Sequence, residues 1–166
     1  MVKIRVAETA SDWREIRGLC VALQEHGRAS DPRMPPGEGM ADAYLGDLLR
    51  KCALYDGKVF VAETSDGVVG YLCVLAKVPC AEPADGLAEQ SEVVDLVVSD
   101  RARSAGVGTA LLASAQAHAA AAGSSHLRVT VFARNASAKT FYEKSGFEPH
   151  EIVYEKPLPA AFRPRQ

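Results

Sequence analysis

The chain has 166 residues, a length that suits one domain built around one hydrophobic core. Its formal net charge of -2 argues against the broad basic surface that non-specific nucleic-acid binding requires. No apolar run approaches the roughly 20 residues that span a membrane, and the first residues lack the apolar stretch of a signal peptide. We therefore expect a cytoplasmic protein without a membrane or nucleic-acid partner. Its four cysteines are expected to be small reduced thiols: Cys20, Cys52, Cys73 and Cys80.

Hydrophobic periodicity predicts a strand and two helices in the first third of the chain. Apolar and polar residues alternate over residues 2–7, and a helical spacing of apolar residues follows, with Ser11 or Asp12 as its cap. Residues 27–39 hold three prolines and three glycines and are expected to form a loop. A second helical pattern covers residues 40–54.

The rest of the chain alternates between strands and helices. Strands are expected at 58–63, 68–78 and 91–98, with a hairpin turn at Asp66-Gly67 and a loop at 79–90. There follow a glycine-bearing turn at 101–108, an alanine-rich helix ending at Gly123, a strand at 126–132, a helix at 135–145 capped by Asn135, and a last strand at 147–156. This order predicts a mixed α/β sheet covered by helices, in a single domain over residues 1–158 with a loose tail at 159–166.

The turn over residues 103–109, Arg-Ser-Ala-Gly-Val-Gly-Thr, stands directly between a buried strand and a helix. A helix start leaves its first N–H groups unpaired and carries partial positive charge, and glycine lets an anion approach the backbone closely. The turn therefore predicts a pyrophosphate cradle, with a plain, tightly packed strand-to-helix turn as the alternative. Two better-known phosphate loops do not fit. No lysine follows Gly106 or Gly108, as a Walker A loop requires, and Leu111 stands where the dinucleotide fingerprint needs a third glycine.

Two segments resemble the GNAT-type N-acetyltransferases. Residues 94–108, VDLVVSDRARSAGVG, are similar to that family's strand followed by Arg/Gln-x-x-Gly-x-Gly/Ala and a helix, with Arg103, Gly106 and Gly108 at the fixed positions. Residues 135–147, NASAKTFYEKSGF, resemble its Asn-x-x-Ala-x-x-Phe-Tyr-x-x-x-Gly-Phe block. The resemblance implies an α/β (α+β) GNAT-like fold, with a mixed central sheet of about six to seven strands flanked by about four helices. It also implies an enzyme that takes acetyl-CoA as co-substrate and an amine as acceptor.

The resemblance further implies how acetyl-CoA is held. The end of the strand at 91–98 is expected to splay from its neighbour and to pair with the pantetheine amides as an added strand would. The turn would hold the pyrophosphate, and Ser104 stands where the family often has glycine. The implied cofactor-binding residues are Leu96, Val97, Val98, Arg103, Ser104, Ala105, Gly106, Val107, Gly108, Thr109, Asn135, Ala138 and Tyr142.

Acetyl transfer by direct attack needs a proton acceptor, a donor to the oxyanion and an acid for the departing thiolate. The motif favours Tyr142 as the acid, with a core tyrosine as the alternative, and the family's usual oxyanion donor is a backbone N–H near Val97. The base is open between Glu92, Asp95 and a water chain. At a period of two the two carboxylates point to opposite faces of the sheet unless a bulge intervenes.

Several functional questions stay open at the level of the sequence. The histidines show no metal-ligand spacing, so no metal site is expected; they are His26, His118, His126 and His150. A non-catalytic acyl-CoA-binding or sensor module would keep the cradle and lack a base, and a nucleotide-binding protein is a third hypothesis. The acceptor could be a protein lysine, a protein N-terminus, a polyamine, an amino acid or an antibiotic amine, and a homodimer is also open.

Overall fold

The computed structural model describes residues 1–80, 86 and 89–158, in two compact units formed by residues 1–135 and 136–166. The loop expected at 79–90 falls mostly outside the described residues, and the tail expected at 159–166 falls entirely outside them. The single domain expected over residues 1–158 stays a prediction.

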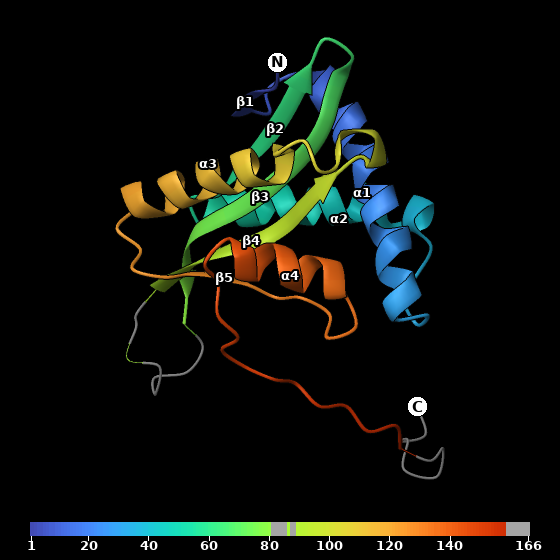
Figure 1. Cartoon of the computed structure of the whole chain (residues 1–166), viewed down its shortest axis with the longest axis vertical. Helices are drawn as coiled ribbons and strands as arrows, with labels where there is room; N and C mark the ends of the chain where they lie inside the picture. The colour runs from blue at the N-terminus through green and yellow to red at the C-terminus, as the bar shows by residue number, and fades with distance from the viewer. Residues whose placement is uncertain (81–85, 87–88, 159–166) are drawn as a thin grey trace. The chain divides into compact units, whose positions relative to one another are not determined.

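The first unit is a mixed sheet with helices on both faces (Figure 1). Its strands follow chain order across the sheet: β1 (Lys3–Val6), β2 (Lys58–Thr64), β3 (Gly67–Pro79), β4 (Glu89–Val98) and β5 (Leu127–Val129). All neighbours pair antiparallel except β4 and β5, which pair in parallel. The predicted α/β class with a mixed sheet is therefore confirmed.

Helices cover the two faces of this sheet unequally (Figure 1). One face carries α1 (Ala10–Ser30) and α2 (Gly37–Leu54), and the other carries α3 (Val107–Ala121). A short 3-10 helix, η2 (Asp100–Ala102), leads from β4 toward α3, and α4 (Ala136–Lys144) belongs to the second unit. With α1 to α4, the part of the chain that the structure describes has the expected number of helices.

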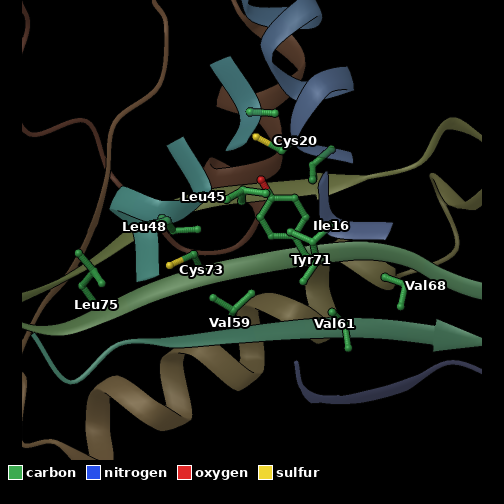
Figure 2. Close-up of a cluster of buried hydrophobic side chains, with 12 residues drawn as sticks. Ile16, Cys20, Leu45, Leu48, Val59, Val61, Val68, Tyr71, Cys73 and Leu75 are labelled. Carbon is green, nitrogen blue, oxygen red and sulfur yellow. The ribbon is translucent and has the colours of Figure 1, made fainter. Parts of the chain in front are cut away.

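Strand β3 is buried along most of its length because each of its faces supports a separate core. Tyr71, Cys73 and Leu75 point to the α1/α2 side, where Figure 2 shows them among side chains of the two helices. On the opposite side, α3 buries residues that include two alanines, Ala115 and Ala119. Side chains this small let α3 approach the sheet closely, which holds the turn at its start in place.

The helix boundaries differ from the expected ones because side chains cap them from outside the periodic pattern. Thr9, rather than Ser11 or Asp12, is the N-cap of α1: its Oγ1 accepts a hydrogen bond from the Asp12 N–H at 3.1 Å, and the Asp12 carboxylate accepts one from the Thr9 N–H at 3.0 Å. Helix α2 begins three residues before Met40, because Glu25 of α1 accepts a hydrogen bond from the Gly37 N–H at 2.7 Å. The loop expected at 27–39 is correspondingly shorter.

The predicted strand at 147–156 is wrong. These residues are all described and form no strand, and β5 spans Leu127–Val129 rather than 126–132, so the described sheet has five strands and not six or seven. Extended backbone becomes a strand only by pairing, and α4 is the one regular element described in the second unit. Separately, no helix in the described ranges is long and apolar enough to cross a membrane.

Candidate functional site

The turn between η2 and α3 presents a row of unpaired backbone donors. In the described part of the chain, no acceptor meets the N–H groups of residues 104–109, whereas the next N–H, of Ala110, donates to the Gly106 carbonyl at 3.0 Å. Helix α3 has no side-chain cap and no acidic residue in its first turn. Its positive end therefore stays open to an anion.

Two residues in the left-handed region shape this turn. Ser104 has a φ of 62° and Gly106 a φ of 76°. Left-handed residues in a turn point neighbouring N–H groups toward a common centre, which makes an anion-binding concavity. A Cβ built on Gly106 would meet no atom within 4 Å, so glycine is needed there for backbone conformation and not for room inside the protein.

Arg103 braces the turn against the end of β4. Its Nε donates to the Val98 carbonyl at 3.3 Å, and its Nη2 forms an ion pair with Asp100 at 2.8 Å. The side chain is exposed, so the guanidinium places a positive charge at the rim of the turn.

Among the described strands, only β3 pairs with the end of β4. Parallel pairing with β5 stops after Ser91, Glu92 and Val93, whereas antiparallel pairing with β3 continues to Val98. The stretch that contains Leu96, Val97 and Val98 therefore has one backbone edge that no described strand occupies. This edge leads directly into the turn at 103–109.

A β-bulge in β4 brings the two candidate bases to the same face. Asp95 pairs with Cys73 and Glu92 with Leu75, and the register shifts between them because Val94 has no partner in β3. Since Cys73 and Leu75 lie on the same face of β3, Asp95 and Glu92 both face α1 and α2. The bulge therefore lets both carboxylates face the same side of the sheet, as the alternation of an unbroken strand would not.

The two carboxylates differ in what surrounds them. Asp95 is 6% exposed, and its two carboxylate oxygens accept hydrogen bonds from the hydroxyls of Tyr44, at 2.7 Å, and Tyr71, at 2.9 Å. Burial raises the pKa of Asp95, and the two tyrosine hydrogen bonds oppose that rise. Glu92 is half-buried, its carboxylate forms no hydrogen bond or ion pair with any described residue, and the parallel register places its backbone opposite Arg128.

The other predicted residues belong to the end of the first unit and to the second. Asn135 donates its N–H to the Phe132 carbonyl at 2.8 Å and immediately precedes α4. In the second unit, the Tyr142 ring packs edge-on against Phe141 and Phe147, with centroids 5.1 and 5.3 Å away. Ala138 and Tyr142 lie in the second unit, whereas Glu92 and Asp95 lie in the first, so a shared site for the acid and base candidates stays a prediction.

Tyr44 and Tyr71 were not predicted as part of this region. The sequence held one indication of them: a carboxylate in an apolar strand needs hydrogen-bond donors, and both tyrosines stand at apolar positions of predicted elements, Tyr44 in a helix and Tyr71 in a strand. Among the histidines, His118 Nε2 contacts the Asp56 carbonyl at 2.7 Å, a contact that joins α3 to the end of α2. The described residues contain no group of three or more metal-ligand side chains.

Comparisons with known proteins agree on one kind of domain. A family model described as "Acetyltransferase (GNAT) domain" matches residues 55–149, more than half of the chain. Solved structures of similar fold include a GCN5-related N-acetyltransferase from Ralstonia eutropha JMP134, which is 18% identical with a TM-score of 0.73, the match covering 95% of this chain and 99% of that one. No protein of curated function matches the sequence significantly.

Two further structures bear named acetyltransferase activities. Glucosamine-6-phosphate N-acetyltransferase from Arabidopsis thaliana is 17% identical with a TM-score of 0.67, and the match covers 96% of this chain and 99% of that one. AAC(6')-Iy, solved with the bisubstrate analog CoA-S-monomethyl-acetylneamine, is 19% identical with a TM-score of 0.68, over 95% of this chain and 99% of that one. At these identities the likeness concerns the fold alone.

Proposed function

Because the chain belongs to the GNAT acetyltransferase family, we propose that it transfers an acetyl group from acetyl-CoA to a primary amine by direct attack. The observation that carries this proposal is the row of unpaired N–H groups at residues 104–109 beside the one-sided end of β4. Coenzyme A combines a diphosphate with an arm of amide groups, and these two neighbouring features match those two chemistries.

The residues of the turn and of β4 divide the binding of acetyl-CoA between them. The N–H groups of residues 104–109 and the positive end of α3 hold the diphosphate, with Arg103 at the rim. The unpaired edge at Leu96, Val97 and Val98 holds the pantetheine amides, and Asn135 and Ala138 contact the same arm. When bound, the thioester supplies an acetyl group that an amine can attack.

The acceptor amine has to lose a proton before or during the attack. A lysine-like amine has a pKa of about 10.4, so its neutral form costs roughly 4–5 kcal/mol at pH 7 without a base. Glu92 is the proton acceptor that its surroundings favour, directly or through water, since its carboxylate is not engaged by any described residue. Asp95, with both oxygens held by tyrosines, instead ties α2 and β3 to the bulge of β4.

Two further groups complete the proposed chemistry. The backbone N–H near Val97 donates to the carbonyl oxygen on which negative charge develops. The hydroxyl of Tyr142 protonates the departing sulfur, whose thiol form dominates at neutral pH because its ordinary pKa is near 8.5.

The proposal is tested by incubating the purified chain with acetyl-CoA and a panel of amines. The panel should include an amino sugar phosphate, an aminoglycoside, a polyamine and peptides with free N-termini or lysines. Product is best measured as free CoA and acetylated amine by chromatography, because the chain's own four cysteines would react with a thiol reagent. Tyr142→Phe should lower turnover by about 100-fold or more while acetyl-CoA still binds in calorimetry. Tight acetyl-CoA binding without any turnover would favour the sensor module instead.

The choice of base is tested by comparing Glu92→Gln with Asp95→Asn. We expect Glu92→Gln to lower turnover by about 100-fold or more with unchanged acetyl-CoA affinity, and Asp95→Asn to lower it less. A larger loss in Asp95→Asn at an unchanged circular-dichroism spectrum would assign the base to Asp95. Comparable small losses in both variants would assign proton removal to water.

A further inference from the structure

Two cysteines from distant parts of the sequence touch in the core. Cys52 lies in the last turn of α2 and Cys73 in the middle of β3, and their sulfur atoms are 3.6 Å apart. Figure 2 shows Cys73 beside Leu48 of α2. Cys73 is 0% exposed, whereas Cys52 is half-buried, so solvent reaches the pair from the Cys52 side.

The backbone around this pair holds the two sulfurs in contact. The Gly57 N–H donates to the Cys52 carbonyl at 2.7 Å, and a Cβ on Gly57 would lie 2.8 Å from the Cys52 sulfur, so only glycine lets the chain turn back this closely. The Tyr55 carbonyl accepts hydrogen bonds from the N–H groups of Ala76 and Lys77, both at 3.0 Å. Backbone hydrogen bonds therefore hold the end of α2 near β3, and those of the Tyr55 carbonyl do not involve the cysteines.

We propose that Cys52 and Cys73 are an oxidation site that forms a reversible disulfide when the protein meets a hydroperoxide. The two sulfurs have to approach from 3.6 Å to about 2.05 Å, a shift that side-chain rotation and a small movement of the α2 end can supply. The proposal rests on this contact and on the accessibility of Cys52, and it does not depend on the transfer activity proposed above.

The reaction begins at Cys52. The hydrogen bond between the two sulfurs lowers the pKa of the Cys52 thiol, and the same bond, together with burial, raises the pKa of Cys73. The Cys52 thiolate attacks one peroxide oxygen, the O–O bond breaks, and a sulfenic acid forms as hydroxide leaves. The sulfur of Cys73 then attacks the Cys52 sulfur, an S–S bond replaces the S–O bond, and water leaves with the Cys73 proton. Two thiols are oxidised and one peroxide is reduced to two molecules of water.

The test treats the full-length reduced chain with hydrogen peroxide and analyses it by mass spectrometry without reductant. We expect a mass lower by two hydrogen atoms, a cross-linked peptide containing Cys52 and Cys73, and full reversal by a dithiol. Cys80→Ser is the matched control, because Cys80 is also half-buried and the variant should form the same link. Cys52→Ser should form none.

A second variant detects the sulfenic acid that precedes the disulfide, so the test does not depend on isolating the disulfide. Cys73→Ser removes the attacking sulfur, so Cys52 should accumulate as a sulfenic acid that a cyclic 1,3-diketone labels. The proposal is overturned if all four thiols of the treated wild-type chain still react with an alkylating agent. It is equally overturned if oxygen atoms are added without a cross-link, or if Cys52 is joined to Cys20, to Cys80 or to another chain.

Discussion

The N-termini of α1 and α3 differ in whether their unpaired backbone N–H groups are capped. At α1 the side chains of Thr9 and Asp12 cap the free backbone donors, and Asp12 also accepts from the Glu8 N–H at 3.0 Å. At α3 neither a capping side chain nor an acidic residue is present, and the N–H groups of residues 104–109 stay unpaired among the described residues. The capped helix start stabilises the fold, and the uncapped one leaves its backbone donors available to an anion.

Asp12 does more at α1 than cap a helix. It is 2% exposed, and its two carboxylate oxygens accept hydrogen bonds from the Arg5 guanidinium at 2.7 and 2.8 Å. The same guanidinium donates to the Glu63 carboxylate on β2 at 3.0 Å. One carboxylate thus joins β1, α1 and, through Arg5, β2. Among the described residues, no comparable charged network lies at the start of α3, where Arg103 forms an ion pair with exposed Asp100 and donates to the Val98 carbonyl.

Removing the closed cap should have the largest effect. Asp12→Ala leaves Arg5 without its buried partner and leaves the N–H groups of Glu8 and Thr9 without their acceptor, so we expect a loss of about 3–5 kcal/mol in the free energy of unfolding. Urea denaturation followed by circular dichroism measures it. Glu63→Gln, which removes the more exposed partner of Arg5, should cost only a small fraction of that. An equal loss in both variants would mean that the cap contributes little.

The pH dependence of stability should separate Asp12 from Asp95. The Arg5 hydrogen bonds hold the pKa of Asp12 well below its unfolded value of about 3.9, so its contribution is complete above that pH and is lost as pH falls further. Burial gives Asp95 the opposite sign, and its contribution is lost as pH rises from about 3.9 through its raised pKa. Unfolding measured from pH 2 to 7 in the wild type, Asp12→Ala and Asp95→Asn should show the slope below about pH 3.9 disappear in Asp12→Ala and the slope above it disappear in Asp95→Asn. Parallel curves in all three would contradict the assignment.

Closing the open helix start should weaken ligand binding without weakening the fold. Thr109→Asp puts an exposed carboxylate in the first turn of α3, where it satisfies the helix dipole and repels a diphosphate. We expect acetyl-CoA affinity to fall by about 10- to 100-fold in calorimetry, with a melting temperature that is unchanged or slightly higher. Thr109→Asn is the neutral control of the same shape and should bind almost as well as the wild type. Equal affinity of the two variants would place the diphosphate elsewhere.

The sequence predicts more of α3 than of the region around Asp95. The turn at 103–109 is encoded locally, since about a dozen neighbouring residues contain its glycines and the start of the helix pattern. In the structure, α3 begins at Val107 within this turn, as the sequence predicts. The Asp95 hydrogen bonds join β4 to Tyr44 on α2 and Tyr71 on β3, and no local pattern encodes such a meeting. The missing strand at 147–156 has the same cause, because β-favouring residues such as Ile152, Val153 and Tyr154 predict extended backbone but not a pairing partner.

The bulge at Val94 exchanges the two faces of β4. Before it, Val93 pairs with Val74 on the α3 side of the sheet; after it, Val97 pairs with Tyr71 on the α1/α2 side. Two valines of the same chemistry and similar burial, in one strand, therefore anchor opposite layers of the molecule. The strand therefore contacts both helix layers, and Glu92 and Asp95 lie on either side of the residue at which its two faces exchange.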